Sequence, residues 1–107
     1  MTGIGGCRSS NAITADTLIT EGQGKVISIH ALATTNGDAA ILTLHDCLTQ
    51  GTCSDANLLA MIAIKATTQS VPVSSEQDMH GIIFRTGLYA DVTVSGGSTS
   101  TFLVNFN

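Results

Sequence analysis

The alternation of side chains in residues 80–94, HGIIFRTGLYADVTV, constrains the fold more than any other feature of the sequence. Its even-numbered positions are mostly apolar, and its odd-numbered positions from Arg85 onward are mostly polar. Successive side chains of a β-strand point to opposite faces of a sheet, so the pattern predicts β-structure with the even set, His80 to Val94, facing inward. We expect Thr86-Gly87 to form either a bend within one strand or a tight turn between two, with glycine allowing a positive φ.

Short β-like runs recur from Ala12 onward, separated by turn residues at a spacing of roughly 8–12 residues. Asn36-Gly37 is a strong signal for a hairpin turn, and the single proline, Pro72, belongs at a strand start or on an edge strand. About eight such runs predict an all-β fold of short antiparallel strands, arranged as a two-sheet sandwich or a barrel.

Residues 54–66 are ambiguous, because they fit either a helix capped by Ser54 or Asp55 or a strand buried on both faces. The β pattern on both sides favours the strand. The expected core consists of apolar residues that share a parity in the last three runs: Ile82, Phe84, Leu88, Val92, Phe102, Val104 and Phe106.

Residues 39–47 and 58–64 are apolar at both parities, whereas an exposed sheet face is normally polar. Charged residues make up only 11% of the chain, against about 25% in ordinary soluble domains, so little like-charge repulsion opposes self-association. Together these features predict that copies of the chain, or a larger scaffold, cover part of its surface.

The net charge of −4 argues against nucleic acid as a partner, because the four cationic side chains are scattered along the sequence. The longest apolar run, residues 58–64, is far shorter than the about 20 residues that span a bilayer, so no membrane partner is expected. The first residues lack the pattern of a secretory signal, and we expect the chain to fold in a cytosol. Residues 1–11 are rich in glycine and serine and are expected to form a flexible arm, followed by one β-domain at 12–107.

No residue pattern predicts a cofactor, a metal site or catalysis. A metal site would recruit His45, Asp46 and Cys47 with His30 or His80, but consecutive residues of a strand do not face one ligand and the usual ligand spacings are missing. Serine, histidine and carboxylate residues are present without a nucleophile motif, so we expect no enzyme. Polar loops of β-sandwiches can bind glycans, although the chain has no tryptophan and one tyrosine for stacking.

The three cysteines are an odd number, which implies no disulfide framework in a cytosolic chain. Cys47 and Cys53 bracket a five-residue loop sequence, LTQGT. We expect them to be buried small side chains or reduced thiols, with a Cys47–Cys53 bridge as the alternative.

The order of these motifs resembles a group of small virion proteins of tailed bacteriophages. The likeness covers roughly residues 24–106 and is poorest between 47 and 79; its most specific part is FRTGLYAD, residues 84–91. The resemblance implies a jelly-roll sandwich of the head decoration, or cement, type, with a loop at 45–57 that is longer than expected.

For such a protein we expect a homo-oligomer, often a trimer, on the outer surface of the head, made in the host cytoplasm and bound across copies of the major capsid protein. The arm, with Ile4, Cys7 and Arg8, would then attach the chain to the capsid or to a neighbouring copy. The alternative is a receptor- or glycan-binding β-sandwich module of the tail or of a fibre.

Overall fold

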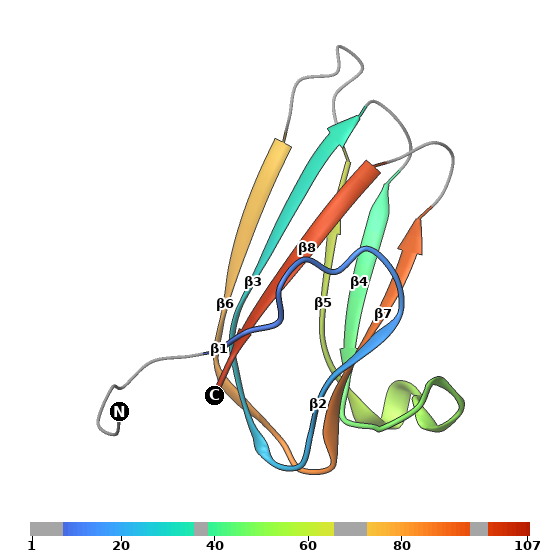
Figure 1. Cartoon of the computed structure of the whole chain (residues 1–107), viewed down its shortest axis with the longest axis vertical. Helices are drawn as coiled ribbons and strands as arrows, with labels where there is room; N and C mark the ends of the chain where they lie inside the picture. The colour runs from blue at the N-terminus through green and yellow to red at the C-terminus, as the bar shows by residue number, and fades with distance from the viewer. Residues whose placement is uncertain (1–7, 36–38, 66–72, 95–98) are drawn as a thin grey trace.

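The computed structural model describes residues 8–35, 39–65, 73–94 and 99–107, and it confirms the predicted all-β sandwich. Two antiparallel four-stranded sheets pack face to face (Figure 1), and the described residues contain no α-helix. None of the described helical segments is long and apolar enough to cross a membrane. The elements are β1 (Arg8–Ser9), β2 (Thr17–Glu21), β3 (Gly24–Thr35), β4 (Ala40–His45), η1 (Gln50–Thr52), η2 (Asp55–Asn57), β5 (Leu58–Ile64), β6 (Val73–Phe84), β7 (Gly87–Val94) and β8 (Thr99–Phe106).

The strand order follows a simple rule. Sheet A has the order β1-β8-β3-β6 and sheet B the order β2-β7-β4-β5. The first strand pairs with the last, the second with the seventh, the third with the sixth, and the fourth with the fifth. The chain therefore has the connectivity of one long hairpin, closed between β4 and β5, that is wrapped into two layers. Among the strands that the structure describes, β4 and β5 are the only consecutive pair that lies in one sheet.

This topology corrects the prediction of a hairpin at Asn36-Gly37. The flanking strands β3 and β4 lie in different sheets and do not pair with each other. An Asn-Gly pair favours a local turn, but it carries no information on which sheet the next strand joins. Residues 36–38 and Pro72 themselves lie outside the described residues.

The prediction of a strand within residues 54–66 is confirmed by β5. The alternative N-cap, Ser54, does cap a helical turn, but this turn is the short 3-10 segment η2 and ends before the strand begins.

The core lies between the two sheets and is filled by alternate residues of both. Its largest fully buried side chains come from β3, β4, β6, β7 and β8: Phe84, Phe102, Ile29, Leu42, Leu44, Leu88, Val26 and Val104. Burying one such side chain contributes about 1.5–3 kcal/mol. Of the residues expected in the core, Phe84, Leu88, Phe102, Val104 and Phe106 are buried, while Ile82 and Val92 are partly buried and pack against the cluster.

The parity prediction fails at the first residues of the run 80–94, which lie within β6. His80 is exposed, with φ of 53°, whereas Met79 is buried. The pairing of β3 with β6 jumps from Val26↔Ile82 to Ser28↔Asp78, so residues 79–81 stand opposite a single residue of β3. This bulge changes which parity faces inward. At the other end of the run, Val94 is also exposed, at 41%.

Thr86-Gly87 belongs to a tight turn between two strands, one of the two expected alternatives, and this turn carries the chain from sheet A to sheet B. Gly87 does not have a positive φ. Space favours glycine there, because a Cβ atom would lie 2.7 Å from Leu48 Cδ2 and 3.0 Å from the carbonyl oxygen of Cys47.

The N-terminal part of the described chain is already paired. Arg8 and Ser9 form β1 against Phe106 and Asn105 of β8. The Arg8 guanidinium carbon lies 4.9 Å from the centre of the Phe106 ring, which is within the range of a cation–π contact. The predicted boundary between arm and domain, at residue 12, therefore falls after the first strand; Ile4 and Cys7 lie outside the described residues.

Candidate functional site

The outer surface of sheet A carries a row of polar side chains with apolar neighbours. We call this surface the sheet A face and define it by side chains of β3, β6 and β8: Ser28, His30, Leu32, Glu76, Leu103 and Asn105. The register places Leu103, His30 and Glu76 side by side across the three strands, and Asn105 beside Ser28 in the next row. Sequence analysis considered His30 as a metal ligand, whereas the alternation Ser28–His30–Leu32 along β3 is the signal that would have marked the face.

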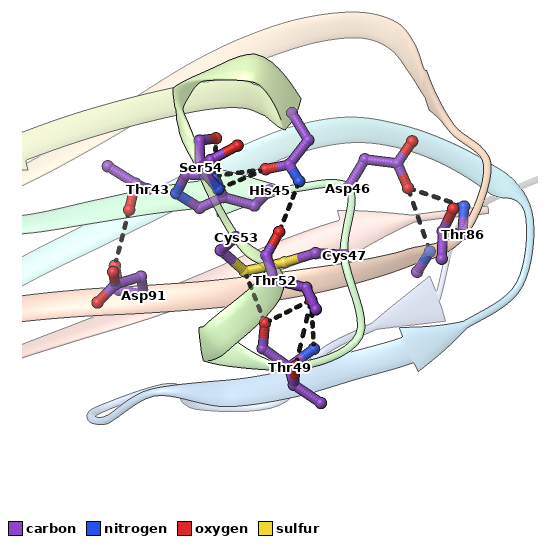
Figure 2. Close-up of a disulfide and its surroundings, with 12 residues drawn as sticks. Thr43, His45, Asp46, Cys47, Thr49, Thr52, Cys53, Ser54, Thr86 and Asp91 are labelled. Atoms are coloured by element: carbon purple, nitrogen blue, oxygen red, sulfur yellow. Dashed lines mark hydrogen bonds between the residues drawn. A yellow bond between two sulfur atoms is a disulfide. The ribbon is translucent and has the colours of Figure 1, made fainter.

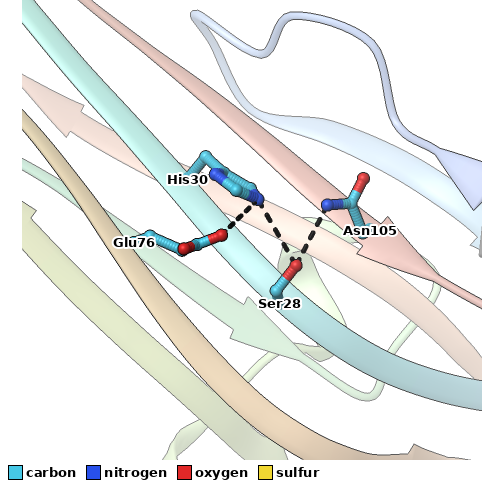
Figure 3. Close-up of polar contacts among 4 residues, drawn as sticks. All are labelled: Ser28, His30, Glu76 and Asn105. Carbon is cyan, nitrogen blue, oxygen red and sulfur yellow. Dashed lines mark hydrogen bonds and ion pairs between the residues drawn. The ribbon is translucent and has the colours of Figure 1, made fainter.

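The polar row is held together by side-chain contacts across the strands (Figure 3). His30 Nε2 lies 3.2 Å from Glu76 Oε2 and 3.5 Å from Ser28 Oγ. Ser28 Oγ in turn accepts a hydrogen bond of 3.0 Å from Asn105 Nδ2. Each of these polar groups therefore has a partner within the same face.

The row contains serine, histidine and a carboxylate, but it is not arranged as a nucleophile with its base. In such a system one ring nitrogen takes the serine proton while the other donates to the acid. Here Nε2 alone contacts both Ser28 and Glu76. A proton on Nε2 that is donated to Glu76 leaves no lone pair there to accept the proton of Ser28.

Apolar side chains border the polar row. Leu32 is 40% exposed and Leu103 is half-buried, and both line a shallow depression of about 560 Å³ with His30 and Glu76. At the other end of the same sheet, Ile83 of β6 is 48% exposed. Covering such side chains would contribute about 25 cal/mol for each Å² of apolar surface removed from water.

A disulfide joins Cys47 to Cys53 and closes the loop that follows β4 (Figure 2). The expectation of reduced thiols is therefore wrong, and the alternative bridge is the one the structure contains. The Cα atoms are 5.6 Å apart, within the usual range for a disulfide. The sequence could not decide between the two states, because η1 brings the cysteines together only in the folded loop.

Asp46, beside the disulfide, fastens the turn between β6 and β7. Its Oδ2 accepts a hydrogen bond of 2.9 Å from the Arg85 N–H, and its Oδ1 accepts bonds of 2.7 Å and 3.2 Å from the N–H groups of Thr86 and Gly87. Partial burial raises the pKa of Asp46, but the N–H donors of residues 85–87 and the Arg85 guanidinium outweigh it and hold the pKa below its ordinary value. Sequence analysis did not reveal this role of Asp46.

The structure separates the residues of the conceivable metal site. Asp46 is bound to main-chain N–H groups, Cys47 is in the disulfide, and His30 and His80 belong to sheet A while His45 belongs to sheet B. Among the described residues no cluster of three or more His, Cys, Asp or Glu side chains could hold a metal ion.

Comparisons with known proteins identify no relative of this chain. No protein-family model matches the chain, and searches of curated proteins and of solved structures return no significant match.

Proposed function

We propose that this protein is a structural component of a bacteriophage particle, a decoration protein that stabilises the head by binding across capsid subunits. The observation that carries the proposal is the strand order, β1-β8-β3-β6 against β2-β7-β4-β5. We infer that this wrapped hairpin is a jelly roll, an architecture that recurs in viral capsid domains. The inference agrees with the resemblance seen in the sequence.

We further propose that the sheet A face is buried between copies of the chain, in a homo-oligomer that we expect to be a trimer. Burying a polar group is costly unless it keeps a hydrogen-bond partner. His30, Glu76, Ser28 and Asn105 already have partners in their own face, so covering them costs less desolvation free energy than covering unpaired polar groups would. Leu32 and Leu103 would supply the apolar contact.

Attachment to the major capsid protein is assigned to the N-terminal segment. β1 pairs with the end of β8 at one edge of sheet A, so the chain before Arg8 starts from a fixed point of the sandwich. Binding energy gained at each copy adds up over an oligomer that holds several capsid subunits at once. In this role the protein needs a rigid core and two contact surfaces, and it needs no catalytic group.

Electron microscopy of purified particles labelled with antibody against this chain tests the proposal. Label on the head supports it. Label on the tail would replace it with the receptor-binding alternative, and unlabelled particles would exclude a virion role.

A chain lacking residues 2–7 tests the attachment segment, because the deletion leaves β1 intact. We expect this variant to fold and to assemble like the full chain but to bind heads more weakly. Unchanged binding to heads would contradict the role of the segment.

A further inference from the structure

A polar pocket opens on the outer surface of sheet B, beside the disulfide loop. It has a volume of about 470 Å³ and is lined by residues of β4, β5, β7 and the loop. Its lining includes two carboxylates, Asp55 and Asp91, and contains no lysine or arginine among the described residues. The sheet A face lies on the opposite sheet, so this pocket is independent of the surface proposed for oligomer contact.

His45 presents a hydrogen-bond acceptor to this pocket. The residue is only 7% exposed. Its Nδ1 lies 3.1 Å from the carbonyl oxygen of Ser54 and 3.2 Å from Asn57 Oδ1. The amide orientation of Asn57 is fixed, because its Oδ1 accepts the Ser54 N–H and its Nδ2 donates to the carbonyl oxygen of Thr52.

Both neighbours of His45 Nδ1 are thus acceptors, so Nδ1 must carry the proton and the neutral ring keeps a lone pair on Nε2. Nε2 has no hydrogen-bond partner among the described residues, and this side of the ring faces Thr43 and Asp91 (Figure 2). Among the described residues no fully buried side-chain nitrogen or oxygen lacks a hydrogen-bond partner, so this acceptor is open to the pocket, where a ligand can donate to it.

Asp91 supplies a second acceptor across the pocket. The register places it beside Thr43, whose hydroxyl donates to the Asp91 carbonyl oxygen at 3.3 Å. Burial raises the pKa of the Asp91 carboxyl group, and the neighbouring Asp16 carboxylate raises it further. A hydroxyl donor from a ligand would stabilise this crowded carboxylate.

Apolar side chains lie on the other side of the acceptors. Met61 of β5 pairs with Thr43 and is 54% exposed, and Leu58 pairs with His45 and is 39% exposed. Both line the pocket. The pocket thus sets two hydrogen-bond acceptors beside an apolar platform, an arrangement that fits a ligand with hydroxyl groups along one edge and C–H groups on its face.

We propose that this pocket binds a neutral sugar, with hydroxyl groups donating to His45 Nε2 and to the Asp91 carboxylate and the sugar's C–H face lying on Met61 and Leu58. This inference goes beyond the proposed structural role, and either can be true without the other. An anionic ligand is disfavoured by Asp55 and Asp91. A metal ion is disfavoured because a ligand set of three is missing from the described residues.

The test is a titration of the full-length protein, labelled with ¹⁵N, with glucose, galactose, mannose and N-acetylglucosamine, followed by NMR. We expect saturable shifts at the amides of Thr43, His45 and Asp91 with at least one of these sugars. N-acetylneuraminic acid, which carries a carboxylate, should leave these amides unchanged. Absence of shifts with all four neutral sugars would overturn the proposal. If spermidine, titrated in parallel, shifts these amides while the sugars do not, the pocket is a site for ammonium ligands instead.

Two variants establish that the shifts report on the pocket. Asp91→Ala removes a hydrogen-bond acceptor and should weaken binding about tenfold or more. Met61→Ala removes part of the apolar contact and should weaken binding several-fold. Both side chains contact solvent, so neither substitution should unfold the protein, unlike replacement of His45, which anchors the loop. The matched control is Asp78→Ala on sheet A, which should bind as the unmodified protein does. Equal affinity in Asp91→Ala would contradict the site.

Discussion

At the scale of single residues, Asp46 links the loop after β4 to a turn that lies far away in the sequence. It follows directly on β4, it precedes the disulfide, and its carboxylate holds the turn between β6 and β7. No local pattern could have revealed this role, because the donors lie about forty residues away. In the sequence Asp46 stands between His45 and Cys47, where a metal ligand is conceivable but is disfavoured by strand geometry.

Replacing Asp46 should therefore destabilise the fold. Asp46→Ala leaves the N–H groups of residues 85–87 without their carboxylate partner, and we expect the free energy of unfolding to fall by about 2 kcal/mol. Urea denaturation followed by circular dichroism measures the change. The control is Asp55→Ala, which removes an exposed carboxylate of the loop and should change stability by less than about 0.5 kcal/mol. Equal effects of the two substitutions would contradict the assigned role.

The contributions of Asp46 and Asp91 to the free energy of unfolding should depend on pH in opposite directions. The folded-state pKa of Asp46 is lowered, so its stabilising contribution is complete above the ordinary aspartate pKa of about 4 and is lost as the pH falls through the folded value. The folded-state pKa of Asp91 is raised, so its relative contribution is greatest below the unfolded value and is lost as the pH rises through the folded one.

Asp91→Asn should therefore stabilise the protein at neutral pH, by about 0.5 kcal/mol, because it removes the repulsion between Asp91 and Asp16. The gain should vanish near pH 3, where Asp91 is protonated in both states. Denaturation curves of both proteins at the two pH values check this. An equal gain in stability at neutral pH and near pH 3 would contradict the raised pKa of Asp91.

At the scale of elements, the bulge in β6 marks the point beyond which the alternation of one strand no longer predicts the inward-facing residues. The alternation of residues 82–92 predicted inward-facing residues correctly at Phe84, Leu88 and Ala90, because this stretch keeps its register apart from the turn. At residues 79–81 the extra residues change the parity, and His80 turns outward. A bulge depends on the partner strand, so the parity of one strand cannot locate it.

The bulge also predicts that Gly81 is sensitive to substitution. Gly81 has a φ of 75°, a left-handed conformation that costs other residues about 1–2 kcal/mol. Gly81→Ala should lower the free energy of unfolding by about that amount. Gly51→Ala is the control, since a Cβ there meets no atom within 4 Å. Thermal denaturation compares the two, and a neutral Gly81→Ala would show that the bulge is not held in this conformation.

The disulfide loop supplies another test at this scale. The bond spans a sequence separation of six, and in the chain-entropy model closure of so short a loop stabilises the fold by about 2 kcal/mol. Reduction should lower the unfolding free energy by that amount. Thiol titration of the denatured protein should find one free cysteine before reduction and all three of the sequence after it. Three free thiols before reduction would contradict the bridge.

At the scale of the whole molecule, spacing and alternation were sufficient to predict an all-β sandwich of about eight strands, because each strand keeps a local pattern. They could not predict which strands pair. The hairpin signal at Asn36-Gly37 joins strands of different sheets, and sheet A brings Glu76 and Asn105 beside β3 from distant parts of the chain. The polar row of the candidate site is a product of that pairing, so its members could not be grouped from the sequence.

The central claim is that copies of this chain cover the sheet A face. Sedimentation velocity of the full-length protein over a range of concentrations tests it most directly, with Leu103→Asp as the variant in the face and Thr93→Asp, an exposed position on sheet B, as the control. We predict one discrete oligomer, a trimer of the 11.0 kDa chain, which Leu103→Asp dissociates and Thr93→Asp leaves intact. A monomer at every concentration, or an oligomer that Leu103→Asp does not weaken, would contradict the claim.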